Sequence, residues 1–339
     1  MTPKHYIIAL IILFSIWIPS GCTGKKEFLI SGQTMGTTYH IKIVAGYFKS
    51  LGGLKKKIAQ RLEAINQSMS IYIPHSEINR FNTIEATQQR FDPSADFRNV
   101  MRIARKTYLL TDGAWDGTVK PLVDLWGFGT RKRKDRVPTS AEIQPLLNQI
   151  GFRHIEIDDS GYLIKRKKEV TLDLGSIAKG YAVDQIAALI RRNRIQDFMV
   201  EIGGETYAAG HRIDGEFWRV GINKPVKTAS FNAIYKVLRL KNKALATSGD
   251  YRNFFEINGK RYSHILDPRT GYPVSNGVVS VSIVSDSCTF ADGLATAVMV
   301  MGPQKGIRLL NRLDRVTGLI VVRGPDGKLM EYDSKGFSQ

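Results

Sequence analysis

Short strand-like runs joined by tight turns constrain the fold of this chain more than any other feature. The clearest example is residues 254–262, where Asn258-Gly259 separates two strand-like segments and favours a type I′ turn. Residues 28–43 predict a strand, a turn at 33–36 and a second strand, and residues 155–164 predict a further hairpin. Hairpins of this kind argue against a doubly wound sheet of parallel strands.

Helices are predicted separately from these hairpins. Apolar residues recur at helical spacing in residues 54–65, 100–108, 143–150 and 290–301, and Ser140 is expected to cap the third of these helices. Further strands are expected at residues 198–202, 217–222, 234–240, 279–284, 319–322 and 328–332. Hairpins mixed with separate helices indicate an α+β fold with mixed sheets and packed helices.

A strand, a turn and a helix are predicted in succession over residues 170–189. Val170 to Leu172 is a short strand-like run, and Ser176 suits the helix N-cap. Asp173 lies at the turn and Lys179 in the opening turns of the helix. Helix N-termini favour phosphate groups because their first N–H groups lack intrahelical partners. An ordinary strand-to-helix junction has the same local pattern, so the residues alone leave both interpretations open.

Composition restricts the possible partners. The chain has 339 residues, 43% of them hydrophobic, which suffices for one large domain or two modest ones. A formal net charge of +18 favours anionic partners such as nucleic acid, phospholipid head groups or phosphorylated ligands. No nucleic-acid-binding motif accompanies this charge, and the densest basic run, residues 131–136, is interpreted as a solvated loop. We therefore expect no nucleic-acid partner.

Residues 1–22 predict a signal peptide of the lipoprotein type. Lys4 and His5 precede an apolar run at residues 6–18, which is too short for a comfortable transmembrane helix. Small residues before Cys22 resemble a lipoprotein cleavage box, in which Cys22 becomes the lipidated first residue, although Pro19 departs from the usual aliphatic residue. An uncleaved membrane anchor is the alternative. Both interpretations place the body of the protein on the periplasmic or extracytoplasmic side of a bacterial membrane.

The remaining residues after the predicted signal peptide are divided into three parts. We expect a tether over residues 23–30, one domain over residues 31–332 and a frayed tail over residues 333–339. With Cys22 lipidated, Cys288 stands alone, which excludes an intramolecular disulfide and a Cys-based metal site. Cys288 is expected to be a small buried residue.

Residues 173–184, which read Asp-Leu-Gly-Ser-Ile-Ala-Lys-Gly-Tyr-Ala-Val-Asp, resemble the signature of the ApbE family, the FAD:protein FMN transferases. The one departure in this block is Ser176, where the family usually has Gly. Other blocks of the family occur in order between residues 31 and 322: Met35-Gly36-Thr37, Ser70-Ile71-Tyr72, Asp116-Gly117-Thr118-Val119, Gly203-Gly204-Glu205, Thr247-Ser248-Gly249-Asp250, His264-Ile265-Leu266-Asp267-Pro268 and Ala291-Asp292 with Thr296. Many ordered blocks make this resemblance far more specific than any single motif.

The resemblance implies a domain of two lobes with FAD in the cleft between them. The residues expected to contact FAD are Met35, Tyr72, Ala114, Trp115, Asp116, Asp173, Lys179, Gly203, Gly204, Thr247, Ser248, Gly249, His264 and Ile265. Aromatic faces suit the flavin or adenine ring, whereas core packing is the alternative for Tyr72, Trp115 and Trp126. The turns at 203–204 and 247–249 either donate N–H groups to phosphate or ribose or are simple strand ends.

A metal site is expected on the helix at residues 290–301. Asp292 and Thr296 are four residues apart, so they project from one face among small or apolar neighbours. A carboxylate there needs a partner, such as a hard cation, or it simply favours the helix's first turn. The resemblance implies that Asp292, Thr296 and an oxygen at the position of Ser176 hold Mg²⁺ beside the FAD pyrophosphate. Some relatives have a second acid where this chain has Ala295.

His264 is the candidate general base, and together with Asp292 it makes up the expected catalytic pair. It lies just past the predicted hairpin, in a block where the family's histidine borders the flavin phosphate. A hydrogen-bonded structural histidine is the alternative. Lys179 is expected either to neutralise or position the ligand or to lie on the surface of its helix.

The implied reaction is Mg²⁺-dependent transfer of FMN from FAD to a Thr or Ser hydroxyl of an acceptor protein, with release of AMP. The resemblance suggests an acceptor with an Asp-Gly-Ala-Thr-like segment on a membrane redox protein. Two alternatives stay open. One is a Mg²⁺-dependent FAD pyrophosphatase, in which water replaces the hydroxyl, and the other is a flavin-binding lipoprotein without turnover.

Overall fold

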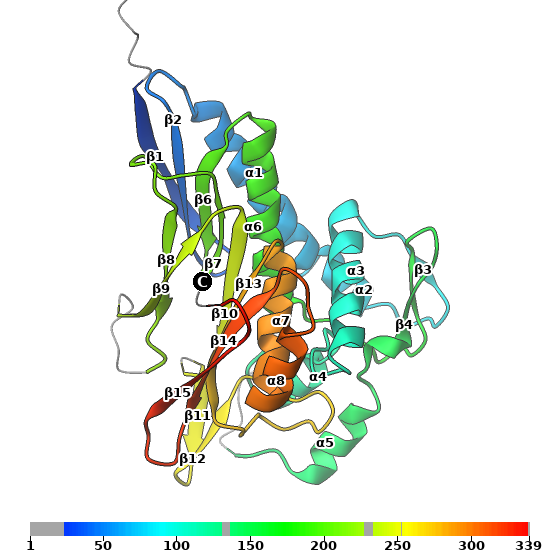
Figure 1. Ribbon diagram of the computed structural model, residues 1–339. Helices are drawn as coiled ribbons and strands as arrows, with labels where there is room; N and C mark the ends of the chain where they lie inside the picture. Colours follow the sequence, from blue (N-terminus) through cyan, green and yellow to red (C-terminus); the bar gives the residue numbers. More distant parts are fainter. Residues whose placement is uncertain (1–23, 131–135, 227–232, 252, 338–339) are drawn as a thin grey trace, which may run out of the picture.

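The computed structural model describes residues 24–130, 136–226, 233–251 and 253–337, and its largest element is an eight-stranded sheet (Figure 1). The strands follow the order β1-β2-β6-β7-β10-β13-β14-β15, and every neighbouring pair is antiparallel. Their bounds are β1 (Lys25–Thr34), β2 (Thr37–Gly46), β6 (Asp197–Ile202), β7 (Glu205–Ala209), β10 (Lys243–Gly249), β13 (Val278–Ser285), β14 (Thr317–Arg323) and β15 (Leu329–Asp333). The expected α+β fold is confirmed.

Helices cover one face of this sheet (Figure 1). The principal ones are α1 (Gly52–Met69), α3 (Ala95–Leu110), α6 (Gly175–Arg192), α7 (Cys288–Met301) and α8 (Pro303–Leu310). Helix α6 packs on β6 and β7, and α7 packs on β10 and β13. A partly buried network also ties three helices together, because Asp96 of α3 accepts from Arg61 of α1 and from the Tyr181 hydroxyl of α6. The two helices that carry the family's signature and the expected metal residues therefore share one layer.

A two-stranded ribbon covers the other face of the sheet. It consists of β8 (Trp218–Asn223) and β9 (Ile234–Leu240). Trp218 packs in a buried cluster with Ala208 and Leu245 of the sheet, and its indole N–H donates to the carbonyl of Ala209 at 2.8 Å. Every residue of β7 is buried, because this strand has helices on one face and the ribbon close to the other. A strand covered on both faces has no alternating pattern in its sequence, and β7 was not predicted.

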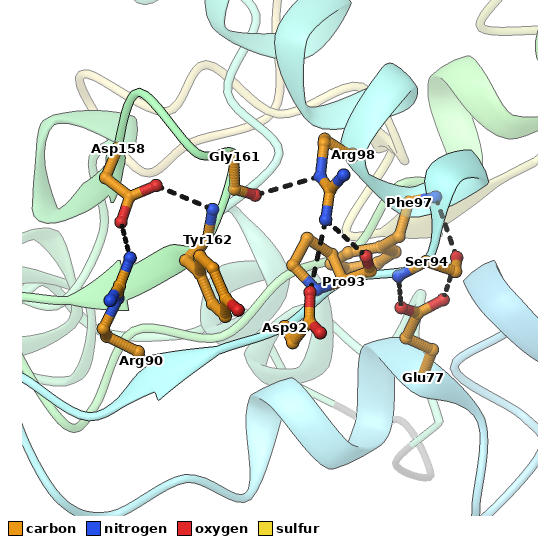
Figure 2. A network of polar contacts seen from close by, with 10 residues as sticks. All are labelled: Glu77, Arg90, Asp92, Pro93, Ser94, Phe97, Arg98, Asp158, Gly161 and Tyr162. Atoms are coloured by element: carbon orange, nitrogen blue, oxygen red, sulfur yellow. Dashed lines mark hydrogen bonds and ion pairs between the residues drawn. The ribbon is translucent and has the colours of Figure 1, made fainter.

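A small three-stranded sheet lies beside α3. It contains β3 (Arg90–Phe91), β5 (Leu163–Lys165) and β4 (Ile155–Ile157), and α2 (Glu77–Asn82) lies nearby. Figure 2 shows how polar contacts hold these parts together: Glu77 accepts from the backbone and hydroxyl of Ser94, which caps α3. Arg98 of α3 donates to the carbonyl of Gly161, so the β4–β5 turn is fixed to the helix layer.

The last group of elements lies at the far end of the molecule from β1 and β2 (Figure 1). It contains α4 (Lys120–Leu125), α5 (Ser140–Leu147), the 3₁₀ turn η1 (Phe152–His154), β11 (Phe254–Ile257) and β12 (Lys260–Ser263). The hairpin β11–β12 is confirmed, with positive φ at both Asn258 (51°) and Gly259 (73°), as a type I′ turn requires. Trp126 is buried against Phe255 and donates to the carbonyl of Gly271, so it is a core residue and not a stacking face for a ligand.

Two local predictions are wrong. Helix α5 is capped by Thr139 rather than Ser140, because Thr139 and Glu142 form a reciprocal capping box. Residues 170–172 form no strand: the amide of Asn82 pairs with both the N–H and the C=O of Leu172, at 2.7 and 2.9 Å. One side chain thus takes the place of a neighbouring strand.

The expected tether and tail are also corrected in part. β1 begins at Lys25 and pairs with β2 over its whole length, so residues 25–30 belong to the sheet. At the other end, Phe337 is buried and the N–H of Ser334 donates to the carbonyl of Gly318, which holds residues 333–337 on the domain. The signal peptide and Cys22 lie outside the described residues. Within the described ranges no helix combines the length and apolar character needed to cross a membrane.

Candidate functional site

A pocket of about 440 Å³ opens where the N-terminal end of α6 meets α7. It is lined from α6 and α7, from the β6–β7 turn, from the end of β10, and from residues 114–128 and 264–268. A second hollow of about 470 Å³ is lined by residues 35–36 and 66–73. The two hollows share Asp173, Gly175 and Lys179, so they meet at the first turns of α6.

Most of the residues expected to contact FAD lie at these two hollows. Those that line the first are Ala114, Trp115, Asp116, Asp173, Lys179, Gly203, Thr247, Ser248, Gly249, His264 and Ile265. Met35 and Tyr72 line the second. Residues separated by up to 230 positions in the sequence therefore gather around one continuous surface.

The glycine turn at 203–204 does not offer free N–H groups. The N–H of Gly203 donates to the carbonyl of Thr38 at 3.1 Å, and that of Gly204 to the carboxylate of Glu201 at 2.7 Å. Gly204 is exposed and lines neither of the two hollows. Of the two alternatives for this turn, the simple strand end fits the structure, because the turn uses both N–H groups within the protein.

Residues 247–249 are the end of a strand. They pair with β13, and their hydroxyls contact neighbouring elements: Thr247 Oγ1 lies 2.8 Å from Ser282 Oγ. Ser248 Oγ lies 3.0 Å from Thr296 Oγ1, which links the sheet to α7 inside the pocket. The alternative of a strand end is confirmed for this block, and Ser248 reaches the site through its side chain.

Helix α6 begins two residues earlier than predicted. Its N-cap is Leu174, and Ser176 lies in the first turn, so the prediction that Ser176 caps the helix is wrong. Asp173 supplies the capping acceptor instead, because its Oδ1 accepts from the N–H of Gly175 at 2.9 Å. Ser176 Oγ accepts from the indole N–H of Trp115 at 3.0 Å. Burial raises the pKa of the Asp173 carboxyl, and its bond to Gly175 opposes that shift.

Asp116 lines the pocket but uses its carboxylate within the protein. One oxygen accepts from the N–H and the hydroxyl of Thr118 at 2.8 and 2.6 Å, and the other accepts from the N–H of Phe152 at 3.1 Å. Burial raises its pKa, and these hydrogen bonds oppose the shift. Asp116 therefore fixes the pocket wall to η1, and the neighbouring Trp115 is buried.

Helices α6 and α7 cross in close contact at Gly180. A Cβ atom there would lie 2.4 Å from the carbonyl oxygen of Cys288 and 2.8 Å from the Cβ of Asp292, so only glycine fits. The N–H of Gly180 donates to Asp292 Oδ2 at 2.9 Å. Asp184, the last residue of the signature, accepts from the N–H groups of Cys288 and Thr289 at 2.8 and 2.9 Å. The signature thus sets the position of α7 and of the side chains that α7 carries.

A charge cluster lies beside this crossing, in which Glu205 and Asp292 are buried and Lys179 is partly exposed. Lys179 Nζ lies 2.5 Å from Glu205 Oε1, and both residues line the pocket with Asp292. Burial opposes the charge of Lys179, but the Glu205 and Asp292 carboxylates outweigh burial and hold the pKa of Lys179 above its usual value. Burial raises the pKa of Glu205 to about 7, and Lys179 opposes that rise. Lys179 is therefore a paired pocket residue and not a surface lysine.

Sequence analysis missed Glu205 as a site residue. Its Oε2 is buried and has no hydrogen-bond partner within the described part of the chain, while Oε1 is paired with Lys179. A buried carboxylate oxygen without a donor is costly unless a ligand or water supplies one. The signal for Glu205 was present: it is an acid directly after the Gly203-Gly204 turn, at the start of a strand without other charges.

The residues expected to hold a metal do converge. Asp292 is buried in the second turn of α7, and Thr296 lies one turn further along the same face. Ser176 lines the same pocket from α6. Within the described ranges no group of three or more acidic, histidine or cysteine side chains could hold a metal ion, so the expected set of Asp292, Thr296 and Ser176 combines one carboxylate with two hydroxyl oxygens. Such a hard oxygen set fits Mg²⁺, which usually keeps waters and phosphate oxygens as its other ligands.

His264 presents one defined nitrogen to the pocket. Its Nδ1 lies 2.9 Å from the carbonyl oxygen of Asn253, and a carbonyl only accepts, so Nδ1 carries the proton in the neutral ring and Nε2 is the basic nitrogen. Burial lowers the pKa of His264, the bond to Asn253 opposes this, and the charge of Lys179 lowers it further. The ring is therefore neutral at neutral pH and suited to accept a proton.

The second hollow has an aromatic wall that solvent reaches. Tyr72 is 71% exposed, and Met35, in the β1–β2 turn with a positive φ of 51°, lines the same hollow. Burial raises the pKa of Tyr72 and the carboxylates of Asp173 and Asp124 add to the rise, so the hydroxyl stays neutral. An exposed ring beside a methionine offers a flat apolar surface for a planar ligand.

Comparison with known sequences gives a consistent result. The model of the ApbE family matches residues 35–320. A protein of Vibrio cholerae named FAD:protein FMN transferase is 41% identical over 331 residues, which is 97% of this chain and 97% of that protein. A protein of Haemophilus influenzae with the same name is 38% identical, over 87% of each chain.

Solved structures agree with the sequence comparison. The flavin transferase ApbE from Vibrio cholerae superposes with a TM-score of 0.84 at 39% identity, covering 93% of this chain and 99% of that one. The apo form of the flavinyl transferase ApbE of Pseudomonas stutzeri gives a TM-score of 0.83 at 35% identity, covering 93% of this chain and 96% of that one. The likeness extends over nearly the whole of each chain.

Proposed function

This chain belongs to the ApbE family and is a flavin transferase, and from that premise we propose that it transfers FMN from FAD to a Thr or Ser hydroxyl of an acceptor protein, with Mg²⁺ present and AMP released. One observation carries the proposal. A neutral histidine, a buried carboxylate on α7 and a paired lysine line one pocket, which meets an aromatic-walled hollow at the start of α6.

His264 is proposed as the general base. A hydroxyl is a weak nucleophile at neutral pH and gains from a base placed beside it. The Nε2 atom takes the hydroxyl proton as the acceptor oxygen forms its bond to the FMN-side phosphorus, and the bond from that phosphorus to the AMP oxygen breaks. The carbonyl of Asn253 keeps Nδ1 protonated, so Nε2 remains the accepting atom throughout.

Lys179 is proposed to stabilise negative charge on the transferring phosphate. Phosphoryl transfer depends mainly on positioning and charge stabilisation, and the paired ammonium group is held at the junction of the two hollows. Met35 and Tyr72 are proposed to bind the flavin ring in the second hollow. FAD would then extend across the start of α6, with its pyrophosphate beside Lys179 and Asp292.

Asp292, Thr296 and Ser176 are proposed to hold Mg²⁺. When bound, the ion supplies charge neutralisation at the pyrophosphate. The chain itself contributes the fixed orientation of these donors: Gly180 holds one oxygen of Asp292, Ser248 contacts the hydroxyl of Thr296, and Trp115 contacts that of Ser176.

The location and the acceptor are proposed from the sequence. The apolar run at residues 6–18, followed by small residues and Cys22, supports a protein that is lipid-anchored to a bacterial membrane on its periplasmic or extracytoplasmic side. An acceptor on a membrane redox subunit, with an Asp-Gly-Ala-Thr-like segment, fits that location. Loss of acyl labelling after Cys22→Ser tests the anchor, and labelling that persists in this variant would contradict it.

One assay tests the reaction. The full chain is mixed with FAD, Mg²⁺ and an acceptor that carries an Asp-Gly-Ala-Thr-like segment, and the products are separated by mass. A flavin-labelled acceptor together with AMP supports the proposal. Free FMN and AMP without label would indicate a pyrophosphatase, and unchanged bound FAD would indicate a carrier.

A further inference from the structure

The end of the molecule where the described chain begins exposes two aromatic rings. Phe48 is 96% exposed and Tyr47 is 60% exposed, and the two rings meet edge to face at 5.4 Å. The N–H of Tyr47 donates to the carbonyl of Gly24 at 2.8 Å, so these rings lie directly beside the first described residue. A phenyl ring that contacts water over nearly its whole surface gains nothing from the fold of a single chain.

Basic side chains lie at the same end of the molecule as these rings. Lys26 Nζ lies 4.9 Å from the centre of the Tyr47 ring, and Lys49 Nζ lies 3.4 Å from the carbonyl oxygen of Asn193, just after α6. That second contact places the C-terminal end of α6, with exposed Arg192 and Arg194, at the same end of the molecule. We define Lys26, Tyr47, Phe48, Lys49, Arg192 and Arg194 as the N-terminal patch.

The adjoining helix start has the same charge. The first turn of α1 contains no acidic residue, and exposed Lys55 and Lys56 follow directly. Acidic residues are the ones that stabilise a helix N-terminus, so a basic start does nothing for the helix itself. The helix start therefore adds positive charge to this end of the molecule.

We propose that the N-terminal patch lies on the membrane, with Phe48 and Tyr47 at the lipid–water interface and the basic residues on anionic head groups. Aromatic rings favour that interface, and lysine and arginine near an anionic leaflet are attracted to it. Residues 1–23, which contain the apolar run and Cys22, join the domain at Gly24, so an anchor there brings this patch to the bilayer first. The inference extends the proposed membrane location and is independent of the chemistry.

The proposal also predicts the distance of the pocket from the membrane. Helix α6 has its C-terminal end in the patch and its N-terminal end in the pocket, and 18 residues of helix span about 27 Å. With α6 upright on the membrane, the acceptor hydroxyl would be presented about 27 Å from the membrane surface. This matches a segment projecting from a membrane protein rather than one lying in the bilayer.

A label beside the patch tests the contact on the full chain. Ser50→Cys carries an environment-sensitive fluorophore next to Phe48, and Glu256→Cys on β11 carries it at the distant end. Cys288 is buried and does not compete for the label. The labelled chains are incorporated into vesicles of phosphatidylethanolamine with phosphatidylglycerol, or of phosphatidylcholine alone, with brominated lipids as quenchers.

We expect a blue shift and quenching at position 50 in the anionic vesicles, with neither at position 256. Phe48→Ser should reduce the quenching, and each of Lys26→Gln and Lys49→Gln should weaken the contact about fivefold. FMN transfer in detergent should stay unchanged in all three variants, which separates this proposal from the chemistry. Equal signals at positions 50 and 256 would overturn the proposal. A blue shift at position 50 that depends on the density of protein on the vesicles, and not on lipid charge, would also overturn it, because it would indicate contact with a second copy of the chain.

Discussion

The two ends of helix α6 differ in whether their polar side chains have partners within the protein or are exposed to solvent. At the N-terminal end, Ser176 and Lys179 each have a named partner, and Gly180 is in contact with α7. At the C-terminal end, Arg192 and Arg194 are exposed to solvent. Buried, partnered groups hold one arrangement, whereas exposed charges act through their sum. Substitutions in the pocket should therefore have large and specific effects, and those in the patch small and additive ones.

His264→Asn should give the largest effect. Asparagine keeps a hydrogen bond to the carbonyl of Asn253 but cannot accept the hydroxyl proton, and loss of a general base costs about 10²–10⁴-fold in rate. Single-turnover FMN transfer is the measurement, with FAD binding measured separately. His211→Asn, on the ring stacked against Phe217, is the control. Transfer at the unsubstituted rate would restrict His264 to a positioning role.

Asp292→Asn should give the next largest effect, on metal binding. It removes the one carboxylate among the proposed ligands, and we expect apparent Mg²⁺ affinity to fall by about 100-fold or more. Calorimetry with FAD present measures binding without turnover. Asp326→Asn, an exposed acid in the β14–β15 turn, controls for overall charge. Unchanged Mg²⁺ affinity in Asp292→Asn would contradict the assigned site.

Gly180→Ala and Arg192→Ala compare the two ends of α6 by their effects on the free energy of unfolding. The added methyl group meets the backbone carbonyl of Cys288, which cannot move without shifting α7, so we expect a loss of about 1–3 kcal/mol in the free energy of unfolding. Arg192→Ala at the exposed end should change stability by less than about 0.5 kcal/mol. Urea unfolding of both variants measures the difference, and equal losses would remove the contrast between the two ends.

The pH dependence should give the smallest effect near neutrality. Because burial lowers the pKa of His264, its ring is neutral above pH 7, and transfer should change less than about twofold between pH 8 and pH 7. The rate should fall as pH drops through a midpoint below the ordinary histidine value, since the protonated ring cannot act as a base. A midpoint above the ordinary value would indicate that a carboxylate dominates the environment of His264.

The sequence predicted the parts of the fold that show a period or a turn signal. The β11–β12 hairpin followed from Asn258-Gly259, and α7 followed from its apolar run. Strand β7 did not, because it is buried along its whole length and shows no alternation. The three-residue strand at 170–172 was predicted in error, since Asn82 satisfies that backbone with a side chain, which no local pattern shows.

The sequence predicted which residues line the site better than it predicted what each of them contacts. His264, Asp292 and Thr296 converge on one pocket, as the resemblance implied. Asp116 and the Gly203-Gly204 turn were expected to face the ligand, but their polar groups are used by Thr118, Phe152, Thr38 and Glu201. Glu205 was missed because its importance depends on pairing with Lys179, a contact between elements 26 residues apart.

The measurement that tests the central claim most directly is a single turnover of the full chain with FAD and Mg²⁺ and an acceptor segment containing one threonine. We predict that the acceptor gains the mass of an FMN phosphoester on that threonine and that AMP appears in equal amount. The same segment with alanine at that position should remain unlabelled. Equal FMN and AMP in solution, with the threonine unmodified, would contradict the account.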